Sequence, residues 1–210
     1  MIITVSRVFG SGGSDVAANV AGQLGWTLLD NDVVDSVAER LGMSSAEVSD
    51  IEERVPTFAE RIATSMRMST PEYVVPIADA SLTDTAEMRV VDTTKRVMEE
   101  AVQRGNVVVV GRGAQVLLAD RPDALHVFCY AAPEVLVQYV ITHHGVDPDA
   151  APQEVEKRNR QREQYIRRNF GRDWRRFENY HLCLDTGRLG IDAAADLVVA
   201  AARSRFNLGA

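Results

Sequence analysis

Short apolar runs alternate along the chain with longer segments in which apolar residues recur every three or four positions. Five of the runs are almost continuous, with few polar residues inside them. Such runs are typical of strands that are covered on both faces, as in a parallel sheet. We therefore expect five strands, at residues 2–6, 26–29, 107–110, 125–130 and 180–184.

The segments between the runs have the spacing of amphipathic helices. In the first of them, apolar residues stand at positions 16, 17, 20, 21 and 24, and Gly25 supplies a stop. Ser44 and Glu47 have the spacing of a capping box. The expected helices are 14–24, 32–41, one that begins at the capping box, 86–104, 133–144, about 152–169 and 191–206. The alternation predicts an α/β fold, a five-stranded parallel sheet with helices on both faces.

The composition fits a single globular domain over residues 1–210. Apolar residues make up 46% and charged residues 25% of the chain, which is ordinary for an enzyme. The first strand begins without a secretory signal, and no apolar stretch has the length of a membrane span. We therefore expect a cytoplasmic protein without a membrane partner. Cys129 and Cys183 lie in apolar runs, and we expect both to be buried.

Positive charge is concentrated in one segment of an acidic chain. The formal net charge is -7, yet residues 157–176 hold nine of the 23 lysines and arginines and only two of the 30 acids. A local excess of this kind favours a site for a small polyanion over a general affinity for nucleic acid. A solvated basic helix is the alternative.

A glycine-rich segment, residues 6–14, follows the first strand and opens the first helix. Backbone amides at such a turn, together with the helix N-terminus, form a phosphate site. If Gly12 is aligned with the second glycine of the phosphate-loop pattern, Ser14 occupies the serine position, but Arg7 and Gly13 replace the first glycine and the lysine. A nucleoside phosphate is the favoured ligand. A dinucleotide loop, which needs a third glycine, and a turn without ligand are the alternatives.

Other charged residues lie where ligands bind in such sheets, at the carboxyl ends of strands. Asp30 ends the second strand, although it could instead cap the helix near residue 32. Arg112 follows the third strand in a Gly-Arg-Gly turn, where it can meet an anion or form a structural ion pair. Arg158 and Arg162 are four residues apart, so they share one face of the basic helix.

Several segments, in order along the chain, resemble the cytidylate kinase-like family. The matching segments are 3–13, 28–30, 109–114, 159–165, 171–174 and 180–186. The resemblance covers nearly the whole chain. Family members commonly carry arginine where this chain has Leu136, and often aspartate where it has Asn159.

The resemblance implies a P-loop kinase fold with a monophosphate-binding insert at about 56–84 and a helical lid at about 152–176. The implied reaction uses ATP and Mg²⁺ to phosphorylate a nucleoside monophosphate, with CMP as the first guess. The catalytic candidates are Arg7, Arg112, Arg158 and Arg162. The donor phosphates would lie on Gly10, Ser11, Gly12, Gly13 and Ser14, with Ser14 also binding Mg²⁺. The acceptor candidates are Asp30, Arg61, Arg67, Tyr73 and Arg112.

Two other functions stay open at this point. The missing loop lysine is compatible with a nucleotide-binding regulatory protein that has little or no kinase turnover. A dinucleotide-dependent oxidoreductase is the weakest alternative. In each case the expected partners are small-molecule nucleotides rather than nucleic acid, and the residues leave both a monomer and a homo-oligomer open.

Overall fold

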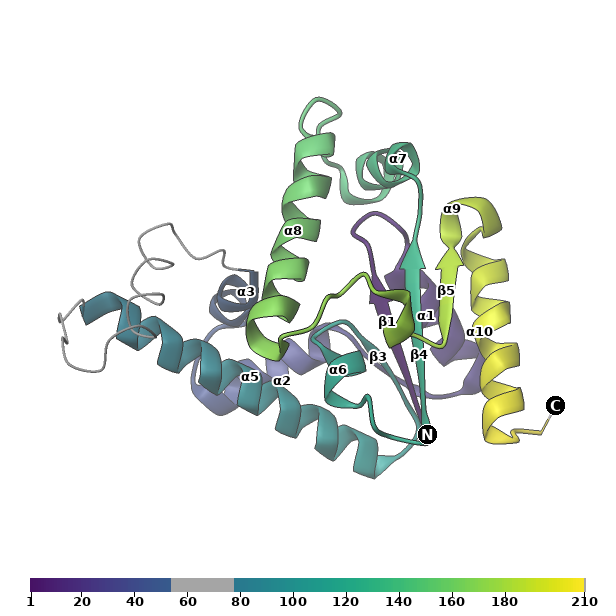
Figure 1. Ribbon diagram of the computed structural model, residues 1–210, viewed down its shortest axis with the longest axis horizontal. Helices are drawn as coiled ribbons and strands as arrows, with labels where there is room; N and C mark the ends of the chain where they lie inside the picture. Colours follow the sequence, from purple (N-terminus) through teal and green to yellow (C-terminus); the bar gives the residue numbers. More distant parts are fainter. Residues whose placement is uncertain (54–77, 210) are drawn as a thin grey trace.

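A five-stranded sheet forms the centre of the molecule (Figure 1). The computed structural model describes residues 1–53 and 78–209. The strands are β1 (Ile2–Arg7), β2 (Thr27–Leu29), β3 (Val107–Val110), β4 (Ala124–Tyr130) and β5 (Leu182–Asp185). They are arranged in the order β2-β3-β1-β4-β5, and every neighbouring pair is parallel. The predicted α/β class and parallel sheet are confirmed.

Helices cover both faces of this sheet. α1 (Gly13–Leu24) and α10 (Ile191–Phe206) pack on one face, and α2 (Asn31–Leu41), α3 (Ser45–Glu53) and α5 (Ala78–Arg104) lie on the other. In β3, Val108 and Val110 join the core under α1 and α10, whereas Val107 and Val109 join the core under α2 and α5. Successive side chains of a strand point to opposite faces, so a strand covered on both must be apolar throughout.

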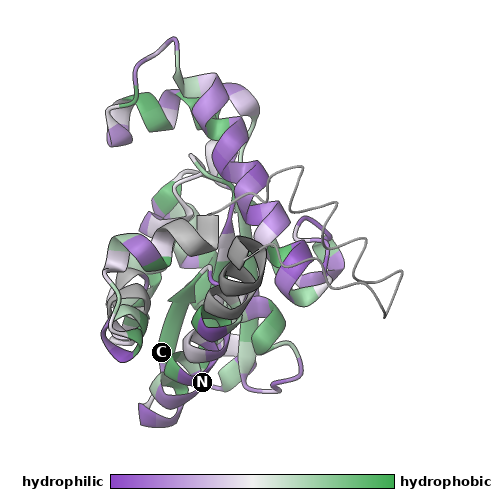
Figure 2. Cartoon of the chain, turned by 90° about the vertical axis from the view of Figure 1, so that its left-hand side faces the viewer, coloured by the Kyte–Doolittle hydropathy of each residue, from purple (hydrophilic) through white to green (hydrophobic). Residues whose placement is uncertain are grey.

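Two further helices form a third layer near the carboxyl ends of β1 and β4. They are α7 (Pro133–His144) and α8 (Ala151–Phe170), and α8 stands beside the sheet in Figure 1. Their apolar side chains, among them Leu136 and Ile166, pack around Val8 and Phe128. Figure 2 shows α8 mostly in the purple of hydrophilic residues, whereas the strands are green. Only a narrow side of α8 therefore belongs to the core.

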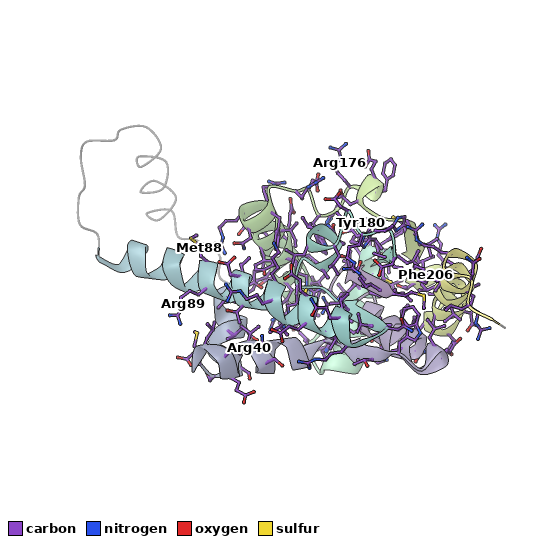
Figure 3. All side chains as sticks on the ribbon, turned by 90° about the horizontal axis from the view of Figure 1, so that it is seen from below. Arg40, Met88, Arg89, Arg176, Tyr180 and Phe206 are labelled. Carbon is purple, nitrogen blue, oxygen red and sulfur yellow. The ribbon has the colours of Figure 1, made fainter. Side chains whose placement is uncertain are left out.

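Three short elements complete the described chain. α6 (Ala114–Leu117) follows β3, the 3-10 turn η1 (Phe177–Asn179) precedes β5, and α9 (Thr186–Leu189) follows β5. Tyr180, expected to begin β5, instead follows η1, and its hydroxyl donates to the Trp174 carbonyl at 2.8 Å. Figure 3 shows Tyr180 within the body and Arg176 at the rim, pointing outward.

Two predictions need correction. α5 begins at Ala78 rather than at residue 86, so the last part of the expected insert, residues 78–84, is helical. Arg61, Arg67 and Tyr73 lie outside the described residues. Cys129 is buried as expected, but Cys183 is exposed. β5 is an edge strand, and while Leu182 and Leu184 face the core under α10, Cys183 alternates to the other side.

Polar contacts fix the ends and the packing of the helices. Ser44 and Glu47 form the predicted capping box, because the Glu47 amide donates to the Ser44 hydroxyl at 3.2 Å and the Ser44 amide donates to the Glu47 carboxylate at 2.8 Å. Below α5 in Figure 3, Arg40 donates two hydrogen bonds to Glu100 and so joins α2 to α5.

Within the described residues, no helix combines the length and apolarity that a membrane crossing requires.

Candidate functional site

The candidate site begins where three neighbouring strands end. Arg7 is the last residue of β1, Asp30 follows β2, and Arg112 lies just beyond β3. The parallel order β2-β3-β1 brings these three strand ends to one edge of the sheet. Arg7 Nη2 lies 3.7 Å from Asp30 Oδ1, and the two side chains are only 19% and 27% exposed. Asp30 occupies the N-cap position of α2, but its side chain makes no capping bond there and lies beside Arg7 instead.

The glycine loop, residues 7–14, connects β1 to α1 and is anchored to β4 and α9. The Val8 amide donates to the Cys129 carbonyl at 2.9 Å, and the buried Thr186 hydroxyl donates to the Ser11 carbonyl at 2.6 Å. Within the described part of the chain, the amides of four loop residues have no hydrogen-bond partner. They are Gly10, Gly12, Gly13 and Ser14. Unpaired amides at a helix N-terminus form an anion site.

Arg7 occupies the space that a lysine at position 13 would need. A side chain on Gly13 would place its Cβ 2.4 Å from Arg7 Cβ, so the arginine stem packs directly on this glycine. Farther out, the guanidinium lies against Gly111, where a Cβ would come within 2.0 Å of Arg7 Nη1. The side chain therefore runs from the glycine loop across the end of β3 toward Asp30.

In the turn after β3, two glycines allow the side chains of Arg7 and Phe170 to lie close to the backbone. Gly111, Arg112 and Gly113 are consecutive left-handed residues, with φ of 70°, 55° and 70°. Arginine adopts this conformation rarely, and such strain is concentrated at functional sites. Both glycines are also contact points, since Gly111 supports Arg7 and a Cβ on Gly113 would lie 2.4 Å from Phe170 Cε2 at the end of α8.

A cavity of about 120 Å³ lies between this edge of the sheet and α8. Four arginines line it, and no acidic residue does so among the described residues of its wall. The lining residues are Ser6, Arg7, Gly111, Arg112, Gly113, Arg158, Gln161, Arg162, Tyr165, Ile166 and Trp174. The predicted catalytic arginines, Arg7, Arg112, Arg158 and Arg162, therefore meet in one place.

The electrostatics of the cavity favour an anion. Burial lowers the pKa of the Arg7 guanidinium, and the nearby Asp30 carboxylate only partly opposes this effect. Burial also lowers the pKa of Arg112, and repulsion from Arg7 lowers it further. In addition, Arg7 Nε is buried and has no hydrogen-bond partner among the described atoms. A bound anion would relieve both the repulsion and the unsatisfied donor.

α8 contributes to the cavity and also touches the glycine loop. Arg162 Nη1 donates to the Arg7 carbonyl at 3.0 Å, and Arg158 donates to Glu154 at 2.7 Å. The Phe9 amide donates to Asn159 Oδ1 at 2.7 Å. α8 is therefore attached to the glycine loop as well as to the third layer of the core.

The structure divides the predicted site residues into separate groups. The four arginines lie together at the cavity, with Asp30 beside Arg7, but of the glycine loop only Arg7 lines the cavity. Thr186 anchors the loop, and Asp185 accepts the Arg188 amide at 3.2 Å and so caps α9. His143 and His144 are exposed. Among the described residues, no group of three histidine, cysteine or carboxylate side chains could hold a metal ion.

Some residues of the site were missed by sequence reasoning. Gln161 and Tyr165 line the cavity beside the arginines. Their positions, three and seven residues after Arg158, are those of one helix face, so helical spacing could have identified them. Phe9 and Asn159 are 150 residues apart in the chain, and no local pattern connects them.

Comparisons with known proteins agree with this architecture. In solved structures, the chain is similar to an uncharacterized protein from Eubacterium ventriosum, with 20% identity, a TM-score of 0.70, and coverage of 97% of this chain and 99% of that one. It is also similar to TT1252 from Thermus thermophilus, with 17% identity, a TM-score of 0.56 and coverage of 100% and 98%. A shikimate kinase from Acinetobacter baumannii, determined with shikimate, gives 16% identity, a TM-score of 0.51 and coverage of 99% and 95%.

These likenesses show the P-loop kinase fold. No curated protein matches the sequence at a significant level. The profile of one family, described as the cytidylate kinase-like family, matches residues 2–188. This match covers most of the chain, including the glycine loop, the Gly-Arg-Gly turn, α8 and β5. The chain therefore belongs to the cytidylate kinase-like family.

Proposed function

We propose that this protein transfers a phosphoryl group from ATP to a nucleoside monophosphate, with CMP as the first acceptor to test. The observation that carries the proposal is the meeting of four arginines around one cavity whose described wall has no acidic residue. Phosphoryl transfer depends on positioning and on neutralising the charge of phosphate groups. A cluster of buried guanidinium groups supplies that charge, and arginine can grip phosphate with two parallel hydrogen bonds.

The two parts of the site would hold the two substrates. The unpaired amides of the glycine loop would bind the donor phosphates, and the arginine cavity would bind the acceptor phosphate and the group in transfer. An oxygen of the acceptor phosphate attacks the γ-phosphorus of ATP. The bond from that phosphorus to the bridging oxygen breaks, ADP leaves, and the acceptor becomes a nucleoside diphosphate.

Each arginine has a place in this scheme. Arg7 lies between the glycine loop and the cavity, so it would replace the charge of the missing loop lysine. Arg112 would hold the acceptor phosphate, with Asp30 orienting Arg7 beside it. Arg158 and Arg162 would cover the transferring group from α8, so that the segment of about 152–176 acts as a lid and excludes water.

A metal ion would be held mainly by the substrates. Mg²⁺ keeps several waters and takes only one or two protein ligands beside phosphate oxygens. The Ser14 hydroxyl, half-buried in the first turn of α1, suits that role, so the residues present fit the ion. When bound, Mg²⁺ would add to the neutralisation of phosphate charge.

The remaining assignments follow from the same scheme. The whole chain, 1–210, would act as one domain, and the insert of about 56–84, with Arg61, Arg67 and Tyr73, would select the acceptor. Its nucleotide partners are small molecules, and the arginine cavity would hold their phosphate groups.

The proposal is tested by measuring ADP release with ATP, Mg²⁺ and a panel of nucleoside monophosphates, beside direct measurement of ATP binding. We expect acceptor-dependent turnover. Arg112→Ala should lower kcat/KM about 100-fold, because it removes one charged donor from a buried site. Arg104→Ala is the matched control, since Arg104 lies at the end of α5, outside the proposed lid, and its side chain is 78% exposed.

Three outcomes would contradict the proposal. ATP binding without turnover on any acceptor would favour a regulatory nucleotide-binding protein. Tighter binding of NAD than of ATP would favour dinucleotide chemistry. An equal loss of activity in Arg112→Ala and Arg104→Ala would remove the arginine cavity from the mechanism.

A further inference from the structure

Asn159 is a polar side chain that is almost completely buried. It is 4% exposed and lies in α8, a helix whose other residues are mostly hydrophilic and half-exposed or exposed. Burying an amide side chain is costly unless it is hydrogen-bonded. Its Oδ1 atom accepts the Phe9 amide of the glycine loop at 2.7 Å, a short bond that joins two parts of the chain 150 residues apart.

The Phe9 ring is held as firmly as its amide. On one side it stacks with His144 of α7, with a centroid distance of 5.3 Å and an interplanar angle of 24°. The guanidinium groups of Arg158 and Arg162 lie 5.9 Å and 5.5 Å from the ring centroid. Cation–π contacts of this kind stabilise a charged group close to an aromatic ring.

A third contact joins α8 to the start of the glycine loop. Arg162 donates to the Arg7 carbonyl. Residues 158, 159 and 162 of α8 therefore each contact residue 9 of the loop, and residue 162 also contacts residue 7. This part of α8 is therefore fixed to the loop by contacts within the protein itself. A change in the position of α8 relative to the loop would break all three contacts together.

The hydrogen bond to Asn159 also separates the Phe9 amide from the loop amides that remain available to an anion. The Phe9 amide points to Asn159 and is not available to a ligand, whereas the amides of Gly10, Gly12, Gly13 and Ser14 are unpaired among the described residues. The backbone at Phe9 adjoins this set directly. The bond that orients the Phe9 peptide therefore also restrains the backbone where the unpaired amides begin, at Gly10.

We propose that Asn159 is a positioning residue, which holds the glycine loop in its anion-binding conformation and at the same time holds Arg158 and Arg162 at the cavity. The proposal rests on the proposed function for its effect on catalysis, but its structural part does not. Asn159 touches no substrate in this scheme and acts through the loop and the two arginines.

The test combines amide hydrogen exchange at Phe9 with ATP affinity and kcat/KM. Asn159→Leu keeps the approximate volume and removes the acceptor. We expect it to raise Phe9 exchange at least 10-fold and to weaken ATP binding about 10-fold. Asn159→Asp restores an acceptor, and a carboxylate accepts more strongly than an amide. This variant should therefore protect Phe9 at least as well as the parent chain and keep its ATP affinity.

Asn106→Leu is the matched control. Asn106 lies just before β3, at the end of that strand away from the site, and its Oδ1 atom also accepts a backbone nitrogen, the N-terminal ammonium group of Met1, at 2.9 Å. The control should leave Phe9 exchange and ATP affinity within about twofold of the parent values.

Unchanged Phe9 exchange in Asn159→Leu would overturn the proposal, as would faster exchange in Asn159→Asp than in the parent. If Asn159→Leu does not fold, the comparison of Asn159→Asp with the parent still decides the matter. A parent chain that shows no turnover would contradict the proposed function, while the exchange results would still test the role of Asn159.

Discussion

Arg7 and Gly13 occupy the positions where the common phosphate loop has glycine and lysine, and their packing shows that the two changes depend on each other. The Arg7 stem fills the space beside position 13, where a Cβ would lie 2.4 Å from Arg7 Cβ and 3.0 Å from Cys129 Cβ. The buried thiol of Cys129, whose pKa is raised to about 12 by burial, closes the other side. A lysine therefore does not fit while the arginine is present.

This dependence predicts the effect of restoring the lysine. Gly13→Lys should lower the free energy of unfolding by about 1–3 kcal/mol, the usual cost of overpacking. The double variant Arg7→Gly with Gly13→Lys should recover part of this loss, because the glycine removes the stem that the lysine would meet. Urea denaturation of both single variants and the double variant forms the cycle that measures the coupling. Strictly additive effects would show that the two positions are independent.

Leu136 is a second position of interest at the residue scale. The family resemblance suggested an arginine there, but Leu136 is buried and packs with Val8 and Val140. A charged side chain in this cluster would lack a partner of opposite charge in the described core. The positive charge of the site therefore comes from β1, the β3–α6 turn and α8.

At the scale of elements, the turn between β3 and α6 is the feature that the site depends on most. Gly111→Ala would add a Cβ 2.0 Å from Arg7 Nη1, in addition to the strain of a left-handed alanine. We expect it to displace the Arg7 guanidinium and to weaken ATP binding at least 10-fold. ATP titration and urea denaturation of the same samples separate the loss of binding from the loss of stability.

Gly42→Ala is the control for backbone strain alone. Gly42 ends α2 with a φ of 66°, and a Cβ at that position would have no described atom within 4 Å. It should cost about 1–2 kcal/mol of stability, as expected for a left-handed non-glycine residue, and leave ATP affinity unchanged. Equal ATP affinities in the two alanine variants would contradict the assigned role of Gly111.

The elements that sequence reasoning placed correctly are those with strong local signals. Val107–Val110 is buried at all four positions, as its continuous apolar run predicts for a strand covered on both faces. Tyr180 also extended an apolar run, but its hydroxyl bonds to Trp174 and its ring packs against Phe128, so it lies outside β5. That arrangement depends on contacts between distant segments, which the local pattern does not contain.

The same distinction applies to the site. Arg7 and Arg112 were found because strand ends in a parallel sheet gather at one edge. Asn159 was noticed only as a departure from the family, and its bond to Phe9 depends on how α8 lies against the glycine loop. Long-range pairs of this kind become visible only when the fold is known.

At the scale of the whole molecule, charge is unevenly distributed. The chain has a net charge of -7, yet four arginines surround one cavity. An acidic surface repels anions at a distance, whereas a basic cavity attracts them at close range.

Salt screens the exposed charges of the molecule more than the buried ones. The exposed ion pairs of α8, such as Arg160 with Glu156, therefore contribute little to the stability of the fold.

A buried histidine links the stability of the whole fold to pH. His126 lies in β4, with its Nδ1 atom 2.7 Å from the Thr4 hydroxyl, and its ring stacks on His181 at a centroid distance of 5.1 Å. Burial, assisted by His181 and Arg205, lowers the pKa of His126 from 6.5 to about 4. Between these two values the unfolded chain binds a proton that the folded chain does not, so acid favours unfolding.

The free energy of unfolding should therefore fall as the pH decreases from 6.5 to 4, with a contribution from His126 on the order of 2 kcal/mol. Urea denaturation at a series of pH values measures this fall. Carboxylates also titrate in this range, so the informative quantity is the difference between the parent chain and His126→Gln, which keeps a polar group near Thr4 but does not titrate. The variant should be less stable than the parent at pH 7, because it loses packing against His181, yet its stability should decline less steeply toward pH 4. Parallel profiles would show that His126 takes up its proton equally in the folded and unfolded states.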